Sequence, residues 1–165
     1  MNWTRAIIDG IMMAAYFNFG AAVFWAYCPK SFTNMYPKAI QKIAPRIGWK
    51  ERKKLLIMYA SVFIPMLAYG VISAYNAGIE GFWNLFWTAY IEIMITNLGD
   101  FFGLDIIFRE KFGKRLEVPG TEGHEAYQRK VWLKTLAIPE HFILWPFIAA
   151  PICALALAGV GLLIR

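Results

Sequence analysis

The sequence predicts an all-α membrane protein with four transmembrane helices in one bundle and a short amphipathic helix in each of two loops. Of its 165 residues, 59% are hydrophobic, whereas a soluble domain is about 45–50% apolar. A membrane span needs about 20 mostly apolar residues. Four runs meet that requirement within a single domain covering residues 1–165, and they lie at residues 6–27, 55–78, 82–108 and 133–164.

The basic residues predict how the chain crosses the membrane. Fifteen of the seventeen lysines and arginines lie in the connections at residues 30–54 and 109–134, and the connection between the second and third runs has none. The positive-inside rule therefore places both basic loops in the cytoplasm and both termini outside the inner (plasma) membrane. Because topology explains the net charge of +6, we expect anionic lipid rather than nucleic acid as the partner of these loops.

The first apolar run shares features with a signal peptide, because Arg5 precedes it and Cys28 follows it. It is too long for such a signal and contains Asp9 and Asn18, so we expect a retained helix. Cys28 and Cys153 are predicted to lie too far apart for a disulfide.

The first basic loop contains a candidate surface helix. Pro37 can begin it and Pro45 can end it, and Ile40, Ile43 and Ile47 recur at helical spacing. Such a helix would lie on the membrane with its apolar side in lipid. The alternative is a basic loop that only sets the topology.

The third run carries polar residues on two faces. Asn97 and Asp100 share one face, and Glu92, Gly99 and Gly103 share another. The two glycines have the spacing that lets another helix approach closely. We expect the face with Gly99 and Gly103 to serve in helix packing. The face with Asn97 and Asp100 is the candidate for chemistry.

The second basic loop contains the turn PGTEG at residues 119–123. Thr121 is suited to cap a helix that starts at Glu122. The alternative is that Thr121 and Glu122 belong to a loop folded back over the cytoplasmic mouth of a site.

The fourth run places Glu140 and His141 about two turns from its cytoplasmic end, among Pro139, Pro146 and Pro151. Prolines free backbone carbonyls, which need partners inside a membrane. An irregular helix beside an acid and a histidine is a good candidate for a functional site.

Helical rise predicts which polar groups share a depth. Asp100, Glu140 and His141 are expected about 10 Å in from the cytoplasmic side, with Asp105 shallower and the asparagines slightly deeper. Ionisable groups at this depth are costly and usually functional. We expect Asp100 within hydrogen-bond or one-water reach of His141 or Glu140, with the network completed by Asn97 or Asn18.

Other charged residues have more local expected roles. Arg109, one turn from Asp105, can neutralise it. Asp9 and Glu92 lie in the outer half and form a possible second polar pair. Each of these groups has a purely structural alternative, which is a satisfied hydrogen-bond network between helices.

Several chemistries have no support in the sequence. It lacks the CxxC, HExxH and GxSxG motifs and a glycine-rich phosphate loop. No compact spacing of ligands predicts a metal site. His124 and His141 could bind haem, but one is predicted in the second basic loop and the other in the fourth run. No cofactor is identified.

The run NLGDFFGLD, followed by the PGTEG turn and a tyrosine-containing stretch, resembles small bacterial four-helix integral membrane proteins of unassigned function. The resemblance covers roughly residues 95–130. It implies the fold and the membrane location and gives no activity.

Three classes of function remain open. The first is a membrane protein whose cytoplasmic polar cavity binds or translocates a small polar or cationic solute. The second is a membrane enzyme that acts on a lipid or isoprenoid with Asp100, Asp105 and His141. The third is an accessory subunit, in which a partner membrane subunit or a second copy of the chain covers the polar residues.

Overall fold

The computed structural model describes residues 2–164, and over this range the chain is all-helical with no strand. Three helices are long and apolar enough to cross a membrane: Trp3–Tyr27, Trp49–Asn76 and Arg129–Leu163. The first is α1. The second joins α3 (Trp49–Met58) to α4 (Ile64–Asn76), and the third joins α7 (Arg129–Trp132) to α8 (Ala150–Leu163).

A further continuous helical stretch covers residues 82–116, as α5 (Phe82–Asp100), a π-helical segment (Phe101–Phe108) and α6 (Arg109–Leu116). It contains Glu92, Asp100 and Asp105 and is not among the three helices that are long and apolar enough to cross a membrane. It is nevertheless central, because α5 packs against both α1 and α8. Glu92, Asn97 and Asp105 are buried in this packing.

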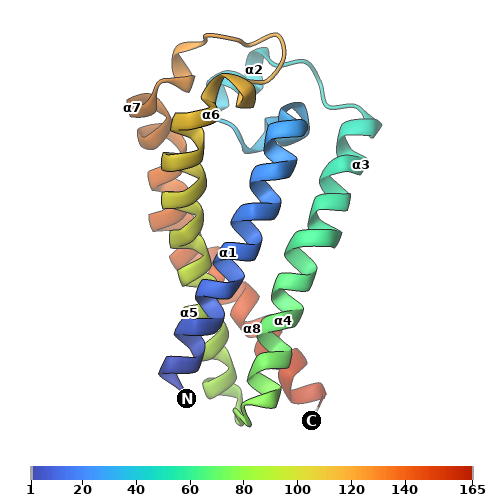
Figure 1. Cartoon of the computed structure of the whole chain (residues 1–165), viewed down its shortest axis with the longest axis vertical. Helices are drawn as coiled ribbons and strands as arrows, with labels where there is room; N and C mark the ends of the chain where they lie inside the picture. The colour runs from blue at the N-terminus through green and yellow to red at the C-terminus, as the bar shows by residue number, and fades with distance from the viewer. Residues whose placement is uncertain (1, 165) are drawn as a thin grey trace.

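Both ends of the chain lie at one end of the molecule (Figure 1). The short helix α2 (Lys38–Ile43), α6 and α7 lie at the other end, together with the basic connections. The polar connection of residues 77–81 joins α4 to α5 at the end where the termini lie.

The helices extend beyond the apolar runs where capping allows it. Asn2 caps α1 by accepting a hydrogen bond from the backbone N–H of Arg5 at 3.1 Å. Before α3, the backbone N–H of Gly48 donates to Glu51 at 3.1 Å. The helix therefore starts at Trp49 and includes the charged residues 50–54 before the apolar run begins.

Wide π-helical turns interrupt several of the long helices. They cover Tyr59–Phe63, Phe101–Phe108, Leu133–Ala137 and Glu140–Ala149. Such turns are uncommon and often occur at functional sites. Here all four segments contribute residues to one cavity.

The first basic connection contains a short helix between Pro37 and Pro45, as predicted. A 3-10 helix (Pro29–Met35) precedes this helix, α2. Ile40 is fully buried in the protein core, whereas Ile43 is half exposed. The apolar side of this short helix therefore packs partly against the protein.

The second basic connection corrects the predicted helix start. Thr121 caps no helix; its hydroxyl bonds the Val118 carbonyl at 2.8 Å and the Tyr127 hydroxyl at 2.6 Å. A 3-10 turn follows at Glu125–Tyr127, and α7 begins only at Arg129. The turn is stabilised by its own side chains, so it needs no helix to satisfy its polar groups.

Candidate functional site

A cavity of about 220 Å³ lies between the described helices. Its walls come from α1, the first connection, the α3–α4 helix, residues 100–105 and residues 132–145. Eight aromatic rings, three carboxyl groups and one histidine line it, and no lysine or arginine does so among the residues described. The polar lining residues are Tyr36, Tyr59, Asp100, Asp105, Glu140 and His141, and the remaining rings are Phe17, Trp25, Phe32, Phe63, Trp132 and Trp145.

His141 is held between two side chains of the residue 82–116 helix. Its Nε2 lies 2.9 Å from Oδ2 of Asp105, and its Nδ1 lies 2.7 Å from Oδ1 of Asn97. The other oxygen of Asp105 accepts a hydrogen bond from Nε1 of Trp132 at 2.9 Å. All four side chains are buried.

The bonding of Asn97 fixes where one proton sits. Its Nδ2 donates to the backbone carbonyl of His141 at 2.9 Å, so Oδ1 accepts from the ring and Nδ1 of His141 carries a proton. One further proton lies between Nε2 and Asp105. With that proton included, His141 and Asp105 together carry no net charge, and both ring nitrogens are engaged.

Asp100 is not the acid bonded directly to His141. No hydrogen bond joins it to His141 or Glu140 among the described contacts, and Asp105 is the acid that holds the histidine. The π-helical turn explains this, because its extra residue per turn rotates Asp105 onto the face of Asn97. Asp100 and Glu140 line the cavity beside this network.

Asn18 and Arg109 also lie apart from the histidine. Asn18 donates to the carbonyl of Ala14 at 2.7 Å, and its oxygen lies against Gly103. Arg109 lies over the ring of Trp132, 4.3 Å from its centroid, and donates to the carbonyl of Tyr127. Within residues 2–164, Arg109 forms no ion pair with Asp105.

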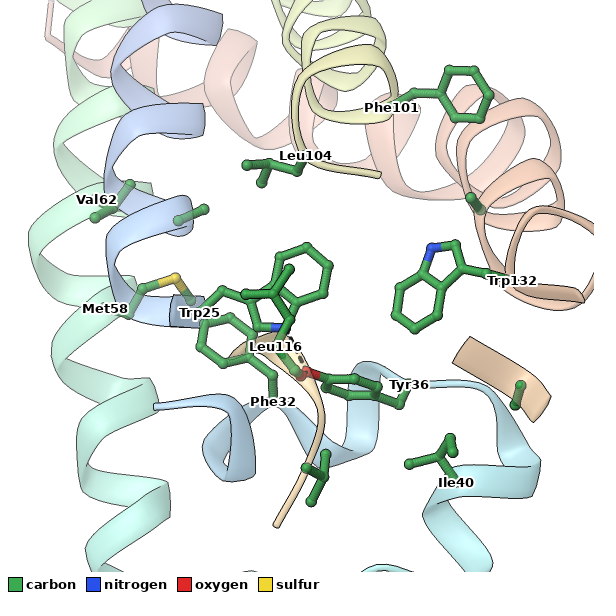
Figure 2. Close-up of a cluster of buried hydrophobic side chains, with 14 residues drawn as sticks. Trp25, Phe32, Tyr36, Ile40, Met58, Val62, Phe101, Leu104, Leu116 and Trp132 are labelled. Carbon is green, nitrogen blue, oxygen red and sulfur yellow. Dashed lines mark hydrogen bonds between the residues drawn. The ribbon is translucent and has the colours of Figure 1, made fainter. Parts of the chain in front are cut away.

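Aromatic side chains line the cavity near the basic connections and belong to a buried cluster, which we name the aromatic closure. Figure 2 shows Trp25, Tyr36, Leu116 and Trp132 within it. Nε1 of Trp25 donates to the Tyr36 hydroxyl at 2.5 Å, and that hydroxyl donates to the carbonyl of Leu116. Burial raises the pKa of Tyr36 well above its usual value, so this hydroxyl keeps its proton at neutral pH.

Thr121 and Glu122 belong to the loop that follows Leu116, the residue whose carbonyl accepts the hydrogen bond from Tyr36. Tyr127 accepts a hydrogen bond from the Val118 backbone at 2.9 Å, and burial raises the pKa of Tyr127. Glu122 accepts from the backbone N–H of Gly120 at 2.9 Å, which lowers the pKa of this carboxyl. Neither Thr121 nor Glu122 lines the cavity.

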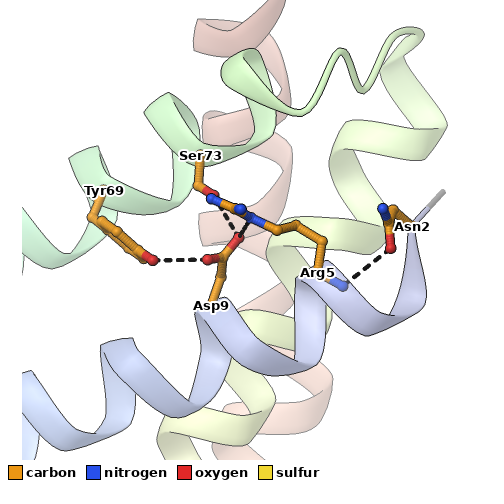
Figure 3. A network of polar contacts seen from close by, with 5 residues as sticks. All are labelled: Asn2, Arg5, Asp9, Tyr69 and Ser73. Carbon is orange, nitrogen blue, oxygen red and sulfur yellow. Dashed lines mark hydrogen bonds and ion pairs between the residues drawn. The ribbon is translucent and has the colours of Figure 1, made fainter.

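Asp9 and Glu92 do not bond to each other. Asp9 accepts hydrogen bonds from Arg5 at 2.8 Å, Ser73 at 2.5 Å and Tyr69 at 2.8 Å (Figure 3). Glu92 is 1% exposed, and its Oε1 has no hydrogen-bond partner. The two acids predicted to form an outer pair therefore differ. Both carboxyl oxygens of Asp9 accept hydrogen bonds, whereas Oε1 of Glu92 has no partner.

Several residues of the site were not predicted from the sequence. Trp132 and Tyr36 resemble ordinary interfacial aromatic residues in the sequence, and Tyr69 and Ser73 resemble ordinary helix positions. Their roles depend on helix rotation. Only the high aromatic content, 17%, was a signal that rings would line the site.

No group of three or more histidine, cysteine, aspartate or glutamate side chains is arranged to hold a metal ion among the residues that the structure describes. Comparison with known proteins found no matching family model, no matching curated protein and no matching solved structure. The helices and their composition indicate an all-helical membrane protein, with three helices long and apolar enough to span a membrane.

Proposed function

We propose that the protein is a four-helix inner-membrane bundle that binds a small cationic solute in this cavity and moves it across the membrane. The observation that carries the proposal is a cavity lined by eight aromatic rings and three carboxyl groups, without lysine or arginine. Aromatic faces and carboxylates both attract cations, and the attraction is stronger away from water.

The charges around the cavity favour a cation over a neutral solute. Asp105 is balanced by His141, as the hydrogen bonds indicate. Asp100 and Glu140 have no ion-pair partner among the described residues. A bound cation would supply the missing positive charge.

The proposed membrane arrangement includes residues 82–116 as the fourth crossing helix. Its four acidic residues lower its hydropathy, but Asp100 and Asp105 line the cavity and Glu92 is buried between helices. Only Glu110, near its basic end, is exposed. The basic connections would face the cytoplasm and both ends of the chain would face outward. The cavity then lies nearer the cytoplasmic side.

Anionic lipid is the proposed partner of the basic connections. A groove of about 710 Å³ beside α6 is lined by five basic side chains: Arg109, Lys111, Lys114, Arg115 and Arg129. Glu110, Glu117 and Asp105 oppose them only in part. Headgroups carrying phosphate suit such a groove at a membrane interface.

A membrane enzyme acting on a lipid or isoprenoid is the second candidate, favoured by the buried Asp105–His141 pair. A general base needs a ring nitrogen that can reach the proton it abstracts. Both nitrogens of His141 are already bonded to protein side chains. This bonding favours a binding role over a catalytic one.

Binding of benzyltrimethylammonium, compared with its neutral isostere neopentylbenzene, tests the proposal. Trp25, Trp132 and Trp145 line the cavity, so intrinsic fluorescence of the purified protein reports occupancy. We expect the cation to bind, and Asp100→Asn or Glu140→Gln to weaken it about tenfold or more, which corresponds to 1.4 kcal/mol. Glu110→Gln, which removes an exposed acid outside the cavity, should leave binding unchanged.

Equal binding of the neutral compound, or unchanged binding in Asp100→Asn and Glu140→Gln, would overturn the cation site. Uptake of the labelled cation into proteoliposomes separates movement from binding. Binding without uptake would leave a receptor or an accessory subunit, and hydrolysis of an added lipid would favour the enzyme.

A further inference from the structure

Glu92 is an isolated acid in the middle of the helix packing. It is 1% exposed, and its Oε1 has no hydrogen-bond partner among the described residues. Its Oε2 lies against the backbone of Gly70, where an added Cβ would come within 2.8 Å of it. Glu92 does not line the aromatic cavity, so the proposed solute site does not use it.

The charged residues near Glu92 already pair with each other. On α1, Arg5 is paired with Asp9 at 2.8 Å and bonded to Ser73 (Figure 3). On α4, Tyr69 donates to Asp9 at 2.8 Å. The α8 residues beside Glu92, Leu157 and Gly161, have no titratable group. Glu92 therefore has no cation to balance an ionised carboxylate.

A small void adjoins the carboxyl. It has a volume of about 10 Å³ and lies between α4, α5 and α8, next to Gly70, Thr88 and Leu157. This is close to the least space that holds one water molecule. Glu92 is the only carboxyl group among the described residues that line it.

We propose that Glu92 is a proton-binding site, separate from the aromatic cavity, that holds a neutral carboxylic acid in this conformation and exchanges its proton through the adjoining void. An unpaired ionised carboxylate buried here would cost several kcal/mol. Protonation removes that charge: a hydronium ion reaching the void gives its proton to one carboxyl oxygen, and neutral water leaves through the void. A metal cation is a poor alternative because it needs several oxygen ligands.

Infrared spectroscopy of the full-length protein in detergent tests the site without any solute. At neutral pH we expect the C=O band of a protonated carboxyl, which Glu92→Gln removes and Glu110→Gln keeps. Glu110 is an exposed glutamate on α6, so its substitution is a matched control. The band should disappear at alkaline pH and should shift on transfer to heavy water.

The outcomes are distinct from those of the solute test. If Glu92→Gln leaves the band unchanged, Glu92 is ionised and the proposal fails. If the band does not shift in heavy water, the proton is trapped and the exchange is wrong. If Glu92→Gln does not fold, the Glu140→Gln variant is prepared with 13C-labelled glutamate and its infrared spectrum is measured. We expect the band of a protonated, labelled glutamate to persist in this variant, and its absence would overturn the proposal.

Discussion

Trp132 positions the buried acid that holds His141. Its indole N–H donates to Asp105 at 2.9 Å, and a hydrogen bond to a charged group contributes about 1.5–3 kcal/mol. Trp132→Phe keeps most of the ring and leaves one oxygen of Asp105 without this donor. We expect a loss of stability of about that size, measured by thermal unfolding in detergent.

The same substitution at an exposed tryptophan is the control for Trp132. Trp83 is 65% exposed, and Trp83→Phe should leave the unfolding midpoint nearly unchanged. Equal midpoints for the two variants would contradict the role assigned to the Trp132–Asp105 hydrogen bond.

Tyr36 gives a prediction about alkaline pH. Because burial raises the pKa of its hydroxyl, the stability gained from the neutral phenol is fully present below the usual tyrosine value of about 10. That stability is lost as pH rises through the higher folded value. Tyr36→Phe should be less stable at neutral pH and should lose less stability on going to alkaline pH.

Unfolding midpoints of wild type and Tyr36→Phe at neutral and alkaline pH check this expectation. Tyr27 is 71% exposed, so Tyr27→Phe should follow the pH dependence of the wild type. Parallel curves for wild type and Tyr36→Phe would show that Tyr36 ionises as freely when folded as when unfolded.

At the scale of the helices, close contact between α1 and α5 depends on Gly99. A Cβ at this position would lie 2.8 Å from Cβ of Ala14, which is closer than two carbon atoms can pack. Overpacking of this kind costs about 1–3 kcal/mol. Gly99→Ala should therefore lower the unfolding midpoint.

Gly159 provides the matched control on α8. An added Cβ there meets nothing within 4 Å, while both substitutions gain the same helix propensity of about 1 kcal/mol. Gly159→Ala should be neutral or stabilising. A Gly99→Ala variant as stable as Gly159→Ala would mean that α1 and α5 can separate without cost.

The helices were easier to predict from the sequence than the contacts between them. Long apolar runs gave the all-helical membrane class, because a bilayer demands length and hydropathy. Asp105 was predicted near the site, but its partner was not. The π-helical turn that rotates it toward His141 has no signal in the local sequence, which explains why Asp100 was expected in that place.

At the scale of the whole molecule, the proposed topology predicts that thiol reagents outside the cell reach only one of the two polar ends. In a background without Cys28 and Cys153, we expect cysteines placed at Lys50 and Glu122 to be shielded from membrane-impermeant thiol reagents in intact cells. A cysteine at Ala77, in the connection opposite the basic loops, should be labelled. The reverse pattern would invert the proposed orientation.

The basic loops and the apolar runs were visible in the sequence because each is a property of composition. The aromatic closure was not, because it joins Tyr36 to a carbonyl eighty positions later. The separation of Asp9 from Glu92 was also hidden. Ser73 and Tyr69 satisfy Asp9 from another helix, and only the packed structure brings them there.

The bond between Tyr36 and Leu116 also bears on the integrity of the chain. The bond joins the first basic connection, before α2, to the end of α6. The non-helical residues 44–48, between α2 and α3, follow Tyr36 in the chain and take no part in it. A protease that nicked the backbone there would leave the N-terminal fragment held by the aromatic closure and by its packing against α5. The nicked molecule would migrate as two pieces on a denaturing gel and as one particle in native size-exclusion chromatography.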